Sequence, residues 1–174
     1  MSSPDALKSD IHRSKPEVVR ARPRPEDYPL HTTEKLRFAD TDCNGHISNA
    51  IFAVCCQNAR MELLHDPNRI PIPLNAQFVI ARLEIDFLGE MHWPGSVLIG
   101  TRCEHVSRSS LLMAQALFVD GRCAASARST VVLMDRVTRR AAPLPSETSH
   151  ALQAFRSVPD SVGAAHSYWP GQEE

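Results

Sequence analysis

The chain has 174 residues, enough for one domain with a buried core, and its 43% hydrophobic and 22% charged residues are ordinary for a globular protein. A formal net charge of −1 gives no overall attraction to nucleic acid or to an anionic membrane, so we expect neither as a partner. Five cysteines, an odd number without a C-x-x-C pair, indicate neither a disulfide framework nor a zinc knuckle. Because no signal-peptide pattern and no run of about 18 apolar residues occurs, we expect a cytoplasmic protein without a membrane span.

The two ends of the chain differ in composition from its centre. Five prolines and mixed charges dominate residues 1–29, which we expect to form a flexible arm because they offer little apolar surface to bury. A single domain is predicted over residues 30–158. The Gly, Ser, Pro and Glu residues that follow predict a loose tail over 159–174.

The first predicted elements of the domain are a strand over residues 31–38 and a long helix over residues 49–65. Ser48 or Asn49 can cap the start of the helix, and Pro67 ends it. Its first two turns are apolar all round, which is typical of a helix enclosed by protein. Apolar residues also recur along one face at spacings of three and four: Phe52, Cys55, Ala59 and Leu63.

Segments with strand patterns follow the helix. They cover residues 78–88, 96–106, 111–119 and 122–134. The last two are separated by Asp120-Gly121, the signal of a type I′ hairpin, which favours an antiparallel strand pair there. A sheet with one buried face needs a cover, and the long helix is the best candidate. With a short C-terminal helix predicted over 146–156, the order of elements predicts an α+β fold.

The loop "DTDCNGHISN" (40–49) opens with the pattern of a calcium-binding EF-hand. The twelfth position of such a loop would be Ile51, which cannot ligate, and a strand rather than a helix is predicted before it, so we expect no calcium. Asp40, Asp42 and His46 offer oxygen and nitrogen donors for a transition metal, but no other cluster completes a ligand spacing, and we predict no metal site. Cys43 near His46 is weak evidence for a thiol nucleophile, because adjacency in sequence does not make the required geometry.

Two interpretations of this loop remain. Asp and Asn in a Gly-containing loop often form Asx-turns and cap the next helix. Alternatively, the loop delivers a carboxylate to the start of a helix, where free N–H groups favour negative charge and can hold an oxyanion. Gly45 would let the backbone approach a ligand closely or take a positive φ.

Four segments, in order along the chain, resemble the 4-hydroxybenzoyl-CoA thioesterase-like branch of the hotdog-fold proteins. They are "RFADTDCNGHISNAIF…NAR" (37–60), "RLEIDFL" (82–88), "SRSS" (107–110) and "VVLMDRVTRRAAPLP" (131–145), of which the first is the most specific. The resemblance implies an antiparallel sheet of about five strands wrapped around one long central helix. It also implies an acyl-CoA thioesterase that needs no cofactor.

The resemblance implies roles for individual residues. Asp42 corresponds to the catalytic carboxylate, as base or as nucleophile, whereas Asp40 looks structural. The backbone N–H of Asn49, helped by Ala50, corresponds to the oxyanion donor. Gln57 stands where many relatives carry Glu, and an amide cannot act as a base. The other candidates for substrate contacts are Gly45, His46, Phe52 and, for the CoA phosphates, Arg108, Ser109 and Ser110, whose alternative reading is a polar turn.

The resemblance further implies that two subunits pair sheet edge to sheet edge with active sites at the interface, as a homodimer or a tetramer of dimers. Two other functions stay open. A hotdog hydratase would use a D-x-N-x-x-H pattern, but Asp42-x-Asn44-Gly45-His46 is one residue shorter. A non-catalytic acyl-CoA-binding protein is the alternative that Gln57 allows. The acyl group itself is not determined by these patterns.

Overall fold

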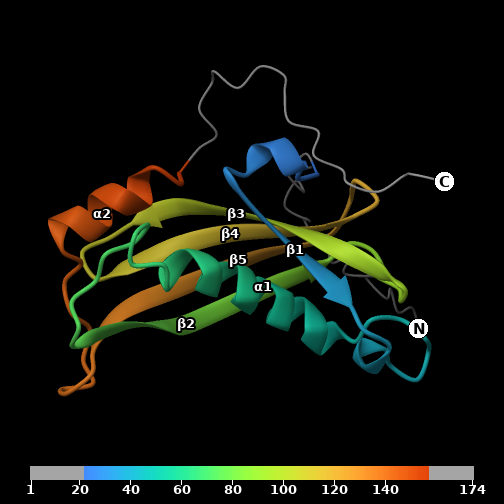
Figure 1. The fold of residues 1–174 in the computed structure, drawn as a ribbon, viewed down its shortest axis with the longest axis horizontal. Helices are drawn as coiled ribbons and strands as arrows, with labels where there is room; N and C mark the ends of the chain where they lie inside the picture. The colour runs from blue at the N-terminus through green and yellow to red at the C-terminus, as the bar shows by residue number, and fades with distance from the viewer. Residues whose placement is uncertain (1–21, 157–174) are drawn as a thin grey trace, which may run out of the picture.

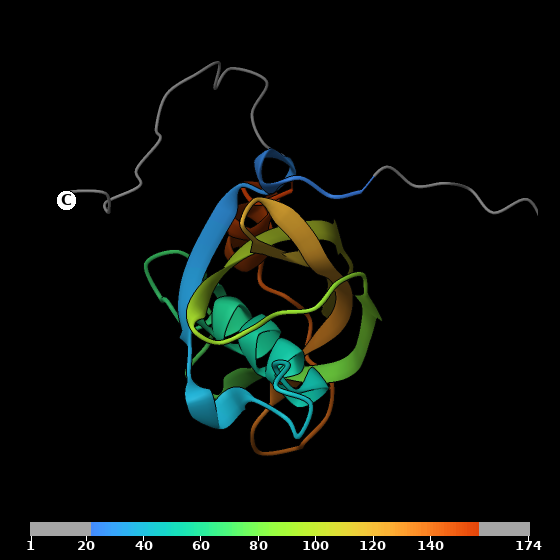
Figure 2. The ribbon, with the colours of Figure 1, turned by 90° about the vertical axis from the view of Figure 1, so that its right-hand side faces the viewer.

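The protein was analysed as a computed structural model that describes residues 22–156. One antiparallel sheet curls around a single long helix, α1 (Asn49–Leu64), as Figures 1 and 2 show. The strands are β1 (Leu30–Leu36), β2 (Ala76–Phe87), β3 (Gly95–Val106), β4 (Ser110–Val119) and β5 (Arg122–Asp135). A second helix, α2 (Ser146–Gln153), and two short 3-10 helices, η1 (Pro25–Asp27) and η2 (Phe38–Asp40), complete the described part. This is the architecture expected from the sequence.

The order of strands in the sheet is β1-β3-β4-β5-β2, and every neighbouring pair is antiparallel. The edge strands of the sheet are therefore β1 and β2, the first two strands along the chain. Asp120 and Gly121 connect β4 to β5 with φ values of 50° and 72°, so the predicted type I′ hairpin is confirmed. Neither helix in residues 22–156 is long and apolar enough to cross a bilayer.

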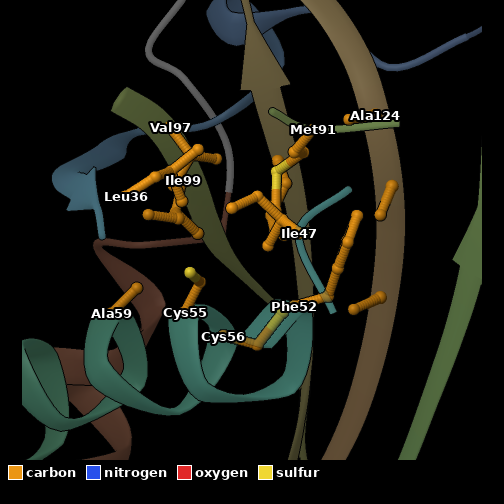
Figure 3. Close-up of a cluster of buried hydrophobic side chains, with 13 residues drawn as sticks. Leu36, Ile47, Phe52, Cys55, Cys56, Ala59, Met91, Val97, Ile99 and Ala124 are labelled. Atoms are coloured by element: carbon orange, nitrogen blue, oxygen red, sulfur yellow. The ribbon is translucent and has the colours of Figure 1, made fainter. Parts of the chain in front are cut away.

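The main core lies between α1 and the sheet. Cys55 and Ala59 project from α1 toward Leu36 of β1 and Ile99 of β3 (Figure 3), whereas the ring of Phe52 lies beside that of Phe87 of β2. Burying such apolar side chains contributes roughly 1.5–3 kcal/mol for each large one, which makes this layer the main source of stability. A second cluster lies under α2 and the far end of α1, and includes Leu63, Ile70, Leu111, Met113, Val131 and Leu152.

Helix α1 matches the predicted range closely but differs from it in two details. Ser48 is the N-cap residue, yet its side chain makes no capping hydrogen bond; its backbone N–H instead donates to the carbonyl of Asp40 at 2.9 Å. The helix is also not enclosed on all sides, since Val54, Gln57 and Met61 are exposed on one face. That face lies beside the edge strand β2, because a groove between the two is lined from both sides.

Part of the expected N-terminal arm lies against the outer face of the sheet. The ring of Tyr28 is buried there, edge-on to Phe118 with a centroid distance of 6.0 Å, and the guanidinium of Arg102 lies over it. Burial raises the pKa of Tyr28 to about 12. Residues 1–21 of the expected arm and the expected tail lie outside the described residues.

Candidate active site

The loop between η2 and α1 is a tight turn closed by backbone hydrogen bonds. Thr41 and Ile47 form an isolated antiparallel bridge, the N–H of Asp42 donates to the carbonyl of His46 at 2.8 Å, and the N–H of Gly45 donates back to Asp42 at 3.1 Å. Gly45 has a φ of +80°, which a residue without a side chain adopts most easily. The backbone of the loop is therefore held in one shape before any ligand binds.

Asp42 uses one of its two carboxylate oxygens to stabilise this turn. Its Oδ1 accepts hydrogen bonds from the N–H groups of Asn44 at 2.8 Å and His46 at 3.2 Å, so the predicted Asx-turn is present. Its Oδ2 accepts no hydrogen bond from residues 22–156, and the side chain is exposed. The two interpretations of the loop are thus compatible, because one oxygen shapes the turn while the other remains accessible.

Asp40, the first acid of the D-x-D pair, is buried and has a different role. Its carboxylate accepts hydrogen bonds from the backbone N–H of Arg37 at 2.8 Å and from Nη2 of the same residue at 2.7 Å. These hydrogen bonds from Arg37 hold the pKa of Asp40 below its usual range. Both oxygens of Asp40 are therefore occupied, and its carbonyl holds the N-cap residue Ser48.

The first turn of α1 offers backbone donors next to this loop. Within the described range, the N–H groups of Asn49 and Ala50 donate to no acceptor, and both residues are exposed. Free N–H groups at a helix start favour negative charge, because they carry the positive end of the helix dipole. The loop that carries Asp42 leads directly into α1, so the accessible carboxylate and the free donors lie on consecutive parts of the chain.

A groove of about 320 Å³ lies along α1, between the helix and β2. Gln57 lines it, as does the largely buried Arg60, whose guanidinium donates to Gln115 in the core. Its other walls are Arg82 and a set of apolar residues, Ala53, Val54, Ile80, Ala81 and Leu83. A second cavity, of about 420 Å³, lies on the opposite side of α1 against β1.

The remaining predicted site residues are placed differently. His46 lies beside Glu90 and His92, and Phe52 lies in the core with its ring 5.1 Å from that of Phe87. The turn of residues 108–110 lies at the end of the sheet next to α2, whereas loop 41–47 lies at the opposite end (Figure 1). Within one chain the structure therefore brings together Asp42, Gly45, His46, Asn49 and Ala50, but not Arg108, Ser109 and Ser110.

Sequence reasoning missed two polar neighbours of the loop, Glu90 and His92. Both lie in the connection from β2 to β3, which runs beside loop 41–47 through a bridge between His46 and His92. No local signal marks them, because the contact depends on how distant segments pair. The alternation Glu90-Met91-His92 in an extended chain, with an apolar residue between two polar ones, is the only trace in the sequence.

Comparison with known proteins identifies relatives of the whole domain. The profile of a family described as the thioesterase-like superfamily matches residues 36–152. A search of curated proteins found no match.

Solved structures with the same fold include a protein from Pseudomonas aeruginosa, 24% identical, with a TM-score of 0.71 over 79% of this chain and 98% of that one. A predicted thioesterase from Bacillus stearothermophilus is 26% identical, with a TM-score of 0.68 over 75% and 98% of the two chains. A thioesterase from Thermus thermophilus, complexed with coenzyme A and Zn, is 30% identical, with a TM-score of 0.66 over 75% and 96%.

Proposed function

Because the chain belongs to the thioesterase-like superfamily, we propose that it is an acyl-CoA thioesterase, which hydrolyses a CoA thioester to a free acid and CoA. The observation that carries this proposal is the accessible Oδ2 of Asp42 in the loop that leads into α1, whose first N–H groups, those of Asn49 and Ala50, are free within the described range. The Thermus thermophilus relative, a thioesterase complexed with coenzyme A, supports a CoA ester as the substrate class.

In the proposed reaction the thioester carbonyl oxygen points at the N–H groups of Asn49 and Ala50. Oδ2 of Asp42 takes a proton from a water molecule, and the resulting hydroxide attacks the carbonyl carbon. The tetrahedral oxyanion is stabilised by the helix N–H groups until the C–S bond breaks. The thiolate of CoA leaves and takes up the proton. In a second version Oδ2 attacks the carbonyl carbon directly, the C–S bond breaks and the CoA thiolate leaves, and water hydrolyses the resulting anhydride to the free acid and the Asp42 carboxylate.

The groove between α1 and β2 is the proposed binding place for the acyl group. Its walls are apolar over much of their length, which suits an acyl chain or ring. Gln57 lies in this groove, where its amide can orient water or the thioester carbonyl but cannot act as a base. Because Gln57 cannot take up a proton, the proposal assigns proton transfer to the carboxylate of Asp42.

We propose that the working unit is a homodimer paired through β2. This strand is an edge of the sheet, is 12 residues long, and exposes the apolar side chains of Ile80 and Phe87. A long edge strand that exposes apolar side chains favours pairing with another strand. A two-fold axis through the paired edges would reverse the partner's strands and turn its residues 108–110 toward the end of the sheet that carries Asp42. This supports, in the dimer, the CoA phosphate contact expected for Arg108, Ser109 and Ser110.

The free thiols of the cysteines support the proposal that the protein is cytoplasmic. All five cysteines are unpaired, and burial raises the pKa of the Cys55 thiol to about 12 and that of Cys56 to about 11. Such a set of thiols persists in a reducing compartment such as the cytoplasm.

Replacing Asp42 by Asn tests the catalytic assignment. The amide oxygen of Asn can accept the same two hydrogen bonds as Oδ1, so the turn is preserved while the base is removed. We expect kcat to fall by about 10²-fold or more, with an unchanged melting temperature. Release of free thiol from short, long and aromatic acyl-CoAs is the measurement, and it also identifies the preferred acyl group.

Asp66→Asn is the matched control. Asp66 also accepts a hydrogen bond from a backbone N–H two residues on, that of Asn68, but it lies beyond the other end of α1. We expect its activity to equal that of the wild type. Wild-type activity in Asp42→Asn would contradict the assignment. Saturable binding of CoA esters without thiol release would favour the non-catalytic binder, and 3-hydroxyacyl-CoA formed from enoyl-CoA would favour the hydratase.

A further inference from the structure

Two histidines and a glutamate meet at the surface where loop 41–47 touches the connection from β2 to β3. Oε2 of Glu90 lies 3.6 Å from Nε2 of His46 and 3.5 Å from Nε2 of His92. One ligand atom from each of the three side chains lies within 4.8 Å of the other two. The two imidazole rings meet edge to face, with centroids 5.0 Å apart and an interplanar angle of 85°.

These separations fit a tetrahedral metal site. Zinc binds histidine nitrogen and carboxylate oxygen at about 2.0–2.2 Å, so two ligand atoms of a tetrahedral site lie about 3.4 Å apart. The two contacts to Glu90 already have this length within a few tenths of an ångström. Only the distance between the two histidine nitrogens, at most 4.8 Å, has to shorten, and rotation of exposed rings can achieve that.

The backbone holds all three side chains on one side. His46 and His92 are paired in an antiparallel bridge, and the N–H of Ile47 donates to the carbonyl of Met91 at 2.8 Å. Met91 and Ile47 are buried in the main core. Because successive residues of an extended chain point to opposite sides, burial of Met91 directs Glu90 and His92 outward together. The site is therefore largely formed by the fold, which reduces the entropy lost when an ion binds.

The ligand chemistry selects the class of ion. Two imidazoles and one carboxylate suit zinc and its first-row neighbours, whereas calcium and magnesium prefer sets of oxygen ligands. Three protein ligands leave one tetrahedral position for water. Without an ion, the exposed contacts of Glu90 with the two histidines would contribute little to stability.

We propose that His46, Glu90 and His92 form a binding site for a divalent transition-metal ion of the zinc class. The ion ties loop 41–47 to the connection from β2 to β3. It thereby stiffens the loop that presents Asp42. Neither the binding of the ion nor the stiffening rests on the proposed function; only an effect of the ion on catalysis would.

Titration of the untagged full-length chain with Co²⁺ tests the site. After removal of metal with a chelator, we expect the visible absorption of tetrahedral Co²⁺ to saturate at one ion per chain and to be abolished by Zn²⁺. Glu90→Gln and His92→Ala should each weaken binding by about tenfold or more. Circular dichroism and the melting temperature of the metal-free variants show that they are folded.

Two control variants keep the test specific. His150→Ala removes an exposed histidine of α2, and Cys43→Ser removes the exposed thiol of the loop; both should bind as the wild type does. The proposal is overturned if the wild type binds no ion at this stoichiometry, if His92→Ala binds as tightly as the wild type, or if either control loses the ion equally.

Hydrogen exchange reads out the effect on the loop without using activity. Adding Zn²⁺ should slow the exchange of the amides of residues 41–48 and 88–92 in the wild type but not in His92→Ala. Because neither measurement uses turnover, a protein that binds zinc without hydrolysing thioesters supports the metal site and contradicts only the proposed function. Unchanged exchange in a zinc-bound wild type would overturn the proposed stiffening.

Discussion

Arg60 brings a positive charge into the space between α1 and the sheet, where it is only 5% exposed. Its Nη1 donates to Oε1 of Gln115 at 2.8 Å, and no carboxylate in residues 22–156 forms an ion pair with it. Burial lowers the pKa of Arg60. Gln115 in turn donates from Nε2 to the carbonyl of Cys56 and to Oγ1 of Thr101. A neutral amide, rather than an acid, therefore orients this guanidinium.

Gln115→Leu tests the importance of this amide. The substitution replaces the polar amide by an apolar side chain of comparable size. The Arg60 guanidinium then loses the acceptor, and the Cys56 carbonyl the donor, that Gln115 provides. We expect the free energy of unfolding to fall by about 2–3 kcal/mol, because a buried donor that carries charge loses its acceptor. Urea unfolding measures the effect. Thr101→Val is the control, because it removes one neutral acceptor, and it should lower the free energy of unfolding by about 1 kcal/mol. A loss in Thr101→Val that equals or exceeds the loss in Gln115→Leu would contradict the central role of Gln115.

At the level of elements, the segment before β1 packs on the outer face of the sheet through a close approach at Gly100. A Cβ at this position in β3 would lie 2.6 Å from Cγ and 2.9 Å from Cβ of Tyr28. Those atoms belong to the base of the tyrosine side chain, so they cannot move unless the segment around Tyr28 moves. The absence of a side chain in one strand thus determines where residues 22–29 lie.

Gly100→Ala should displace Tyr28 from the sheet and lower the free energy of unfolding by about 1–3 kcal/mol, as overpacking does. In a Tyr168→Phe background, which leaves Tyr28 as the single tyrosine, absorbance titration should show its pKa falling from about 12 toward the ordinary value of about 10. Gly89→Ala is the control, because its nearest neighbour would be at an ordinary 3.7 Å. A Tyr28 that keeps its raised pKa in Gly100→Ala would contradict this packing.

For the whole molecule, the decisive feature is that the sheet ends in two unlike edges. Edge β1 carries mainly polar and charged residues, whereas edge β2 exposes Ile80, at 50%, beside the exposed face of α1. The loop with Asp42 pairs with the connection that runs from β2 to β3. A partner seated on β2 would cover apolar surface and close the groove between α1 and β2 that is proposed to bind the acyl group.

Ile80→Glu should convert the proposed dimer into a monomer, because two buried like charges would face each other across the two-fold axis. Size-exclusion chromatography with light scattering measures the mass, and thiol release should fall with it. Thr33→Glu, on the exposed face of the other edge strand, should leave the dimer intact. A monomeric wild type would contradict the proposed assembly.

Local patterns in the sequence predicted much of this protein. The apolar spacing predicts a helix over 49–65, and the structure has α1 at Asn49–Leu64. The hairpin at Asp120-Gly121 is predictable because Asp and Gly tolerate the two consecutive positive φ values that a type I′ turn requires. The Asx-turn of Asp42 was equally readable, since its partners are two and four residues away. These features depend on neighbours within a turn or two of the chain.

Tertiary structure alone decided the features that join distant segments. The strand order β1-β3-β4-β5-β2, the contact of Arg60 with Gln115, and the meeting of His46 with Glu90 and His92 depend on which edges pair and in which register. Periodicity specifies which face of a strand or helix is buried, but it does not specify which surface will cover that face. Which surface covers a given face is determined by shape complementarity and hydrogen bonding across the assembled core, because the hydrophobic effect itself is not directional.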